Sequence, residues 1–282
     1  MTFQQEVLMS FIHRRNLKTK LKKGALILVS IYVLVGVGLY FFQESFIFQP
    51  TTLPKDHVFE LSYQFEEYIH NPKEGVVINA LHIKSQNPKG VIFYCHGNAG
   101  DLQRWGKLVE YLVDLNYDVY IFDYRGFGKS ERTMSEAAFY EDAEFCYQHL
   151  KQFWDEDEII IYGRSLGSAA AVKVASQNKA RALILEAPFS SITDVGKSRF
   201  PIYPVSSLLK YEFPNNKYIK DVNYPISIIH GTNDFTIPLS SAQKLFESSN
   251  NSNTSFTIID NGGHNNLQDF DLYHKRIGEI LR

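Results

Sequence analysis

The chain has 282 residues, of which 44% are hydrophobic and 21% are charged, and its formal net charge is −2. This is the composition of a globular protein with one large core, and a near-neutral charge gives no electrostatic reason to expect a nucleic-acid partner. The only cysteines, Cys95 and Cys146, are too few for a disulfide framework and lie in apolar runs, so we expect both to be reduced and structural.

The N-terminus combines a basic run with an apolar run. Residues 14–23 contain six Arg and Lys side chains and no acidic one, and residues 24–42 carry no charge. As a helix the apolar run would span roughly 28 Å, close to the hydrocarbon thickness of a bilayer. Its last residues, Tyr40 to Phe42, would lie where aromatic side chains meet the membrane surface.

Residues 24–42 are therefore predicted to be a single transmembrane signal anchor. A buried core helix and a cleavable signal peptide are the alternatives, but core helices are seldom apolar over this length, and no small-x-small cleavage site follows Phe42. Because the basic run precedes the apolar one, the positive-inside rule places residues 1–23 in the cytoplasm and the large domain on the exocytoplasmic side.

The rest of the chain is predicted to be a short linker, residues 43–56, and one domain, residues 57–282. Two strands are expected at 57–65 and 76–83, and from residue 91 apolar strand runs alternate with amphipathic helices. The later strands are expected at 91–97, 118–126, 158–165, 182–188, 225–234 and 256–260, and the helices at 102–115, 135–153, 166–177, 240–248 and 271–281. This alternation predicts an α/β fold with a mostly parallel central sheet of about eight strands and helices on both faces.

The alternation lapses over residues 190–224, which contain Pro201, Pro204, Pro214 and several aromatic residues. A loop this long inside a compact domain usually has a function. Two interpretations stay open for it, an irregular surface excursion and a short cap over the substrate.

A nucleophile elbow is predicted at residues 163–167, Gly-Arg-Ser-Leu-Gly. A β-branched run precedes this motif and good helix formers follow it, so Ser165 would lie at the apex of a strand-turn-helix. Gly163 and Gly167 are what such a tight turn requires, because larger side chains at these positions would collide. The motif alone is weak evidence, since Gly and Ser are common residues.

A serine nucleophile needs a base, and the base needs an orienting carboxylate. In an open parallel sheet these groups lie on the loops that follow the strands. Asp234 ends the predicted strand 225–234, and His264 follows the predicted strand 256–260. We therefore expect Ser165 to be the nucleophile, His264 the base and Asp234 the acid, with Glu186 as the reserve candidate for the acid.

An oxyanion hole is predicted beside the elbow. His96-Gly97-Asn98-Ala99-Gly100 follows the first long buried strand, and small residues there let the backbone face a substrate oxygen. The expected donors are the backbone N–H groups of Asn98 and of Leu166, the residue after the nucleophile.

Five sequence blocks together resemble the signature of α/β-hydrolase-fold serine hydrolases. They are HGNAGD (96–101), DYRGFGKSE (123–131), GRSLGS (163–168), HGTNDFTIP (230–238) and NGGHNNL (261–267). The chain is most similar to the small α/β-hydrolase-domain proteins with one N-terminal membrane anchor, and more loosely to the serine aminopeptidase and monoacylglycerol lipase branches. The resemblance covers about residues 45–282 and implies the same triad, but it implies no particular substrate. The short cap departs from the larger lipases, which leaves interfacial activation unsupported.

Two other motifs suggest chemistry that the sequence does not support. Residues 126–130, Gly-Phe-Gly-Lys-Ser, resemble the end of a phosphate-binding loop. However, Asp123 stands where the Walker pattern needs glycine, so no nucleotide is expected. Residues 155–158 are an acidic run typical of a solvated loop, and no Cys or His spacing predicts zinc. We expect neither a cofactor nor a metal.

The sequence thus predicts a membrane-anchored serine hydrolase that cleaves acyl or lipid-like carboxylic esters through an acyl-enzyme. The membrane and a small-molecule or lipid ester are its expected partners. An acyl-thioesterase or a serine peptidase or amidase of the same fold is the alternative within enzymes, and a binding protein on a non-catalytic hydrolase scaffold is the alternative outside them.

Overall fold

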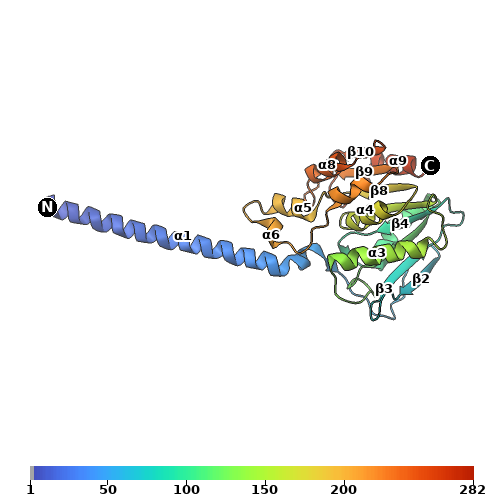
Figure 1. Ribbon diagram of the computed structural model, residues 1–282, viewed down its shortest axis with the longest axis horizontal. Coiled ribbons are helices and arrows are strands. Elements are labelled where there is room, and N and C mark those ends of the chain that lie inside the picture. Colours follow the sequence, from blue (N-terminus) through green and yellow to red (C-terminus); the bar gives the residue numbers. More distant parts are fainter. Residues whose placement is uncertain (1–2) are drawn as a thin grey trace. The chain divides into compact units, whose positions relative to one another are not determined.

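The computed structural model describes residues 3–282. The N-terminal part is one helix, α1 (Phe3–Ile47), and the described chain divides into two compact units, one up to Phe46 and the other Ile47–Arg282 (Figure 1). Within α1, residues Phe11–Ile47 are long and apolar enough to cross a membrane. A membrane anchor and a signal sequence share these properties. Residues 1 and 2 of the predicted basic segment 1–23 lie outside the described residues.

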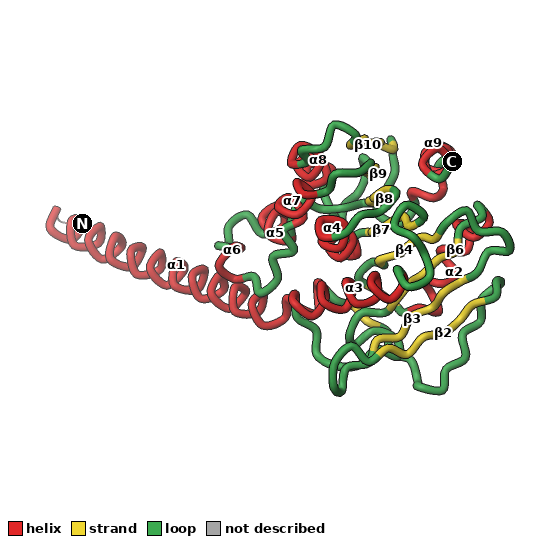
Figure 2. The backbone as a smooth tube through the Cα atoms, turned by 45° about the vertical axis from the view of Figure 1, so that its right-hand side comes forward, coloured by secondary structure: helices red, strands yellow, loops and turns green. Residues whose placement is uncertain are grey.

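A mixed sheet of eight strands organises the described unit Ile47–Arg282. Its order is β10-β9-β8-β7-β4-β6-β3-β2, and all eight strands are labelled in Figure 2. The neighbours from β10 to β6 pair in parallel, and β3 pairs antiparallel with both β6 and β2. The strands are β2 (Phe65–His70), β3 (Ile78–Ile83), β4 (Val91–Cys95), β6 (Asp118–Phe122), β7 (Ile159–Arg164), β8 (Ala182–Glu186), β9 (Ile226–Gly231) and β10 (Thr254–Ile259). The predicted mostly parallel sheet is therefore confirmed.

Helices cover both faces of the sheet because its strands are apolar on both sides. Along β4, the side chains of Phe93 and Cys95 pack in a core with α3, α4 and α8, whereas Ile92 and Tyr94 pack in a second core with α2 and α9. The helices are α2 (Leu102–Asp114), α3 (Glu136–Leu150), α4 (Gly167–Gln177), α8 (Leu239–Ser248) and α9 (Asp271–Ile280), and a short 3₁₀ helix, η2 (Leu267–Asp269), precedes α9. Each fully buried large apolar side chain stabilises the fold by about 1.5–3 kcal/mol.

Residues 190–224 form short helical pieces rather than an extended loop. They are α5 (Ile192–Arg199), α6 (Val205–Leu208), α7 (Asn215–Tyr218) and the 3₁₀ helix η1 (Ile219–Asp221). No residue of α5 is buried, whereas Tyr211 and Phe213 are buried in the core with α3 and α4. The second half of this segment is therefore part of the domain core, and only its first half is an exposed excursion.

The strand predicted at 57–65 is wrong. The strand of this region forms later, as β2, because it must run up to the turn at 71–75 to pair with β3. Before it, the backbone N–H groups of Glu60 and Ser62 donate to the side chains of Gln103 and Glu110 on α2, not to a neighbouring strand. The alternating apolar side chains that suggested a strand at 57–65 pack against α2 instead.

The segment predicted as a linker, residues 43–56, is partly regular structure. Helix α1 continues to Ile47, and β1 (Gln49–Pro50) pairs in parallel with β5 (Ala99–Gly100). Proline suggested a linker because it has no N–H to donate, but the donors of this short ladder are Gln49 and Thr51, so Pro50 does not interrupt it. The compact unit therefore begins before residue 57.

Both cysteines are free and buried, as expected. Burial raises the pKa of the Cys95 and Cys146 thiols well above the ordinary value, so both stay neutral at physiological pH. A neutral, enclosed thiol is a poor nucleophile, which supports a structural role for both residues.

Candidate active site

The elbow at Ser165 is a sharp turn between β7 and α4. Ser165 has φ +52°, a left-handed conformation that costs a non-glycine residue free energy. A Cβ at Gly163 would lie 2.5 Å from Cβ of Ala171, and one at Gly167 would lie 2.0 Å from the carbonyl oxygen of Cys95. Glycine at both positions therefore lets α4 and the end of β4 approach the turn closely enough to hold Ser165 in this conformation.

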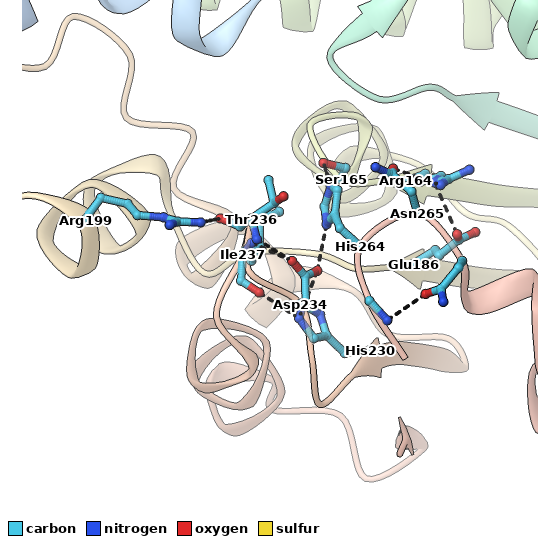
Figure 3. A network of polar contacts seen from close by, with 12 residues as sticks. Arg164, Ser165, Glu186, Arg199, His230, Asp234, Thr236, Ile237, His264 and Asn265 are labelled. Carbon is cyan, nitrogen blue, oxygen red and sulfur yellow. Dashed lines mark hydrogen bonds and ion pairs between the residues drawn. The ribbon is translucent and has the colours of Figure 1, made fainter. Parts of the chain in front are cut away.

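A hydrogen-bonded chain links the three predicted triad residues (Figure 3). Ser165 Oγ lies 2.9 Å from His264 Nε2, and His264 Nδ1 lies 2.6 Å from Asp234 Oδ2. A carboxylate only accepts, so Nδ1 carries the proton, and Nε2 is left to accept from the Ser165 hydroxyl. The tertiary structure thus brings together side chains from the ends of β7, β9 and β10.

The Asp234 carboxylate is buried and has a donor on each oxygen. Oδ1 accepts from the backbone N–H groups of Thr236 and Ile237, each at 2.8 Å. Burial works to raise the pKa of Asp234, but the hydrogen bond and charge of His264 together with the Ile237 N–H outweigh it, so that this pKa is lowered overall. The carboxylate is ionised at neutral pH, and the stability it contributes is lost only as the pH falls through its lowered pKa.

His230 is a second imidazole beside Asp234. Its Nε2 lies 3.0 Å from the carbonyl oxygen of Ile237 and 3.4 Å from Asp234 Oδ2. The carbonyl can only accept, so Nε2 carries the proton. Burial lowers the pKa of His230, more than the Asp234 charge raises it, which keeps this ring neutral. His230 is therefore a neutral ring next to Asp234, and its Nε2–H donates to the Ile237 carbonyl.

The predicted oxyanion loop lies directly against the elbow. A Cβ at Gly97 would lie 3.7 Å from the Cβ of Ser165. The N–H of Ser165 itself donates to the carbonyl of Glu186, and no hydrogen bond of the Asn98 or Leu166 N–H is found within residues 3–282. Both N–H groups remain able to bind a substrate oxygen, and that of Leu166 precedes the N-terminus of α4, where the helix dipole favours negative charge.

Glu186, the reserve candidate for the acid, is part of a different network. Its Oε1 lies 3.2 Å from Arg164 Nε, and its Oε2 accepts from the hydroxyls of Tyr162 and Tyr273 at 2.6 and 3.0 Å. The Glu186 and Arg164 side chains are both buried, so this pair satisfies charge in the core. Asp234, not Glu186, is hydrogen-bonded to His264.

Arg164 and Asn265 were missed as residues of the site. The Arg164 guanidinium donates through Nη2 to Asn265 Oδ1 at 3.4 Å and lies 5.2 Å from the ring centre of Trp105. Asn265 follows His264 directly, so Glu186 and Arg164 restrain the loop that carries His264 (Figure 3). An arginine at the end of an otherwise apolar strand was the available signal, because a charge buried there requires a partner.

The block 123–131 contributes buried ion pairs to the domain. Asp123 Oδ1 lies 3.2 Å from His96 Nε2, with both side chains fully buried, and burial raises the pKa of Asp123. Arg125 forms a bidentate ion pair with Asp142 on α3. Within the described residues, no group of three or more His, Cys, Asp or Glu side chains is arranged to hold a metal ion.

Similarity to known proteins identifies the fold of this chain. Residues 86–217 match the family model described as Serine aminopeptidase, S33. The structure is similar to that of the Pyrococcus furiosus esterase Pf2001, with a TM-score of 0.65 and 20% identity over 83% of this chain and 98% of that one. The chain therefore has the α/β-hydrolase fold, and the predicted fold is confirmed.

Two further proteins are similar to this chain in sequence. An uncharacterized protein of Mycobacterium tuberculosis is 28% identical over 88% of this chain and 90% of its own length. The lysophosphatidylserine lipase ABHD12 of Danio rerio is 32% identical over 57% of this chain and 48% of its own length.

Two buried carboxylates at neighbouring strand ends allow a matched test of the acid. We expect Asp234→Asn to lower kcat for a p-nitrophenyl ester by about 10⁴-fold, because the amide cannot hold His264 in the required tautomer. Glu186→Gln should instead destabilise the protein by about 3 kcal/mol, since Arg164 loses its counter-charge.

Two quantities are measured for each variant. One is the midpoint of thermal unfolding, and the other is kcat at a temperature where both variants are folded. Equal losses of kcat in the two variants, or an active Asp234→Asn protein, would contradict the assignment of the acid.

Proposed function

We propose that this α/β hydrolase is a serine hydrolase that cleaves carboxylic esters. The observation that carries the proposal is the continuous chain of hydrogen bonds from Ser165 through His264 to Asp234 at the carboxyl ends of three strands. A hydroxyl bonded to a neutral imidazole, which is itself oriented by an ionised carboxylate, is the arrangement that activates serine for attack on a carbonyl.

The proposed reaction has two halves. The Ser165 oxygen attacks the acyl carbon while His264 takes its proton, and the N–H groups of Asn98 and Leu166 bind the oxyanion that forms. His264 then gives the proton to the leaving alcohol, which leaves an acyl-Ser165 ester. Water, deprotonated by His264, attacks this ester and releases the carboxylic acid. Each oxyanion donor is expected to lower the barrier by about 3 kcal/mol.

Esters are favoured over other acyl compounds by the similar proteins. The structural relative is named an esterase, and the relative with 32% identity is named a lipase of lysophosphatidylserine. Exposed Phe200, Ile202 and Phe235 lie on the excursion and next to the acid, where they would favour an apolar acyl group over a polar peptide.

Amide or peptide hydrolysis is the second candidate, because the matched family model is described as serine aminopeptidase. Thioester hydrolysis needs the same triad. A non-catalytic binding protein is the alternative of another class, and the intact hydrogen-bonded triad argues against it.

We further propose that α1 anchors the protein in a membrane, with the N-terminus in the cytoplasm and the hydrolase unit on the exocytoplasmic side. The support is the apolar stretch within Phe11–Ile47 and the basic residues that precede residue 24. Basic residues next to a membrane helix stay on the cytoplasmic side.

The nucleophile is tested by labelling with a fluorophosphonate probe, which reacts with activated serines. We expect stoichiometric labelling of the full-length protein at Ser165 and none in Ser165→Ala. Ser168→Ala, which removes a neighbouring buried hydroxyl, is the matched control and should be labelled like the wild type. A folded wild-type protein that does not react would refute the proposed function.

The substrate class is tested with p-nitrophenyl esters of increasing acyl length beside an acyl-thioester and an aminoacyl amide. We expect kcat/KM to rise with acyl length, by up to about tenfold for each 1.4 kcal/mol of added apolar burial, and to be lowest for the amide. A flat response over acyl length would remove the lipid-like preference, and a preference for the amide would favour the peptidase.

Membrane orientation is tested by adding protease outside cells whose outer envelope has been made permeable. The hydrolase unit should be digested, while a tag fused before residue 1 is protected until the membrane is dissolved. Protection of the hydrolase unit together with loss of the tag would reverse the proposed topology.

A further inference from the structure

The segment that leaves α1 is hydrogen-bonded to the oxyanion loop. Directly after Ile47, where α1 ends, β1 pairs in register with β5, so that Gln49 faces Ala99 and Pro50 faces Gly100. The Gln49 N–H donates to the carbonyl of Asn98 at 2.7 Å, and the Thr51 N–H donates to the carbonyl of Gly100 at 2.9 Å.

Three successive carbonyls of the oxyanion loop are each held by a donor from outside the loop. Those of Asn98 and Gly100 are held by β1 and Thr51, and the one between them, of Ala99, accepts from the indole N–H of Trp105 on α2 at 2.7 Å. The loop is thus fixed from two sides, by α2 and by the residues that follow α1. Without the donors that follow α1, the carbonyls of Asn98 and Gly100 have no hydrogen-bond donor within residues 3–282.

The same segment also forms hydrogen bonds with a second loop, the one that contains Gly128. Leu53 donates to the carbonyl of Gly128, and Gly128 donates back to the carbonyl of Thr51, each at 2.8 Å. This second loop begins at Asp123, which faces His96 at 3.2 Å. Residues 48–53 therefore join two loops that converge on the end of β4.

Phe48 fixes the start of the segment in the core. Its side chain is 8% exposed and its ring packs edge-on against Tyr211, with ring centres 5.1 Å apart, and against Phe213 at 6.4 Å. An aromatic ring buried in this way restricts the backbone on either side of it, so Gln49 begins from a defined position.

We propose that residues 48–53 position the oxyanion loop for catalysis, so that this segment of the unit Ile47–Arg282 is a working part of the active site. This inference rests on the proposed function. The carbonyl and the N–H of Asn98 belong to one residue and are separated only by its φ and ψ rotations. A hydrogen bond that fixes the carbonyl therefore limits where the N–H can point, and a preorganised donor is what stabilises an oxyanion.

Two consecutive exposed threonines provide a matched pair of variants in the full-length protein. The Thr51 N–H donates to Gly100, whereas no hydrogen bond of the Thr52 N–H is found in the part of the chain that the structure describes. Proline removes the N–H at either position, so Thr51→Pro breaks the ladder and Thr52→Pro does not. Thr51→Val keeps the N–H and removes only the hydroxyl.

Activity is measured as kcat per active site. The concentration of active sites is obtained by titration with the fluorophosphonate probe, which corrects kcat for any inactive fraction of the protein. We expect Thr51→Pro to lower kcat by about 10- to 100-fold with little change in KM, because a small displacement of a catalytic donor has an effect of this size. Thr52→Pro and Thr51→Val should stay within about twofold of the wild type. A Thr51→Pro protein as active as Thr52→Pro would overturn the inference.

Amide hydrogen exchange of the peptide 96–101, read by mass spectrometry, tests the positioning without any need for activity. Exchange should be faster in Thr51→Pro than in Thr52→Pro, and equal exchange would overturn the inference. A wild-type protein that the probe does not label, with exchange that still differs between the variants, would refute the ester hydrolase and leave the control of this loop by residues 48–53 standing.

Discussion

The conformation of Ser165 is the constraint on which the other parts of the site depend. A left-handed backbone at a serine is unfavourable by itself, and it persists because the chain around it leaves no alternative. The Ser165 N–H is bonded to the carbonyl of Glu186 on β8, and Gly167 lies against the carbonyl of Cys95 at the end of β4. The central strands of the sheet thus hold the turn, and the same contact with β4 brings Gly97 beside Ser165.

Buried polar groups account for the rest of the geometry. Asp234 can remain ionised in the domain interior because two backbone N–H groups and His264 satisfy its oxygens. Glu186 balances Arg164, which reaches the loop of the base through Asn265. Each of these groups would destabilise the fold without its partners, so the fold and the site have the same requirements.

The N-terminal joint adds a third restraint. In a protein with a simple tether, the residues between a membrane helix and a soluble domain would be free to vary in length and conformation. Here Phe48 is part of the core, and Gln49 and Thr51 complete the hydrogen bonding of the oxyanion loop. The compact unit Ile47–Arg282 therefore includes residues that a sequence-based division assigned to the linker.

The sequence by itself determined the layered α/β fold, the elbow and the identity of the three residues that form the hydrogen-bonded chain, because strand periodicity, paired glycines and strand-end polar residues are local patterns. Only the tertiary structure decided that residues 57–63 bond to side chains of α2 in place of a strand, that Pro50 lies within a ladder, and that Glu186 pairs with Arg164 rather than His264. In each of these cases the partner is distant in the sequence, and a residue's own pattern states which hydrogen bonds it needs but not which group will supply them.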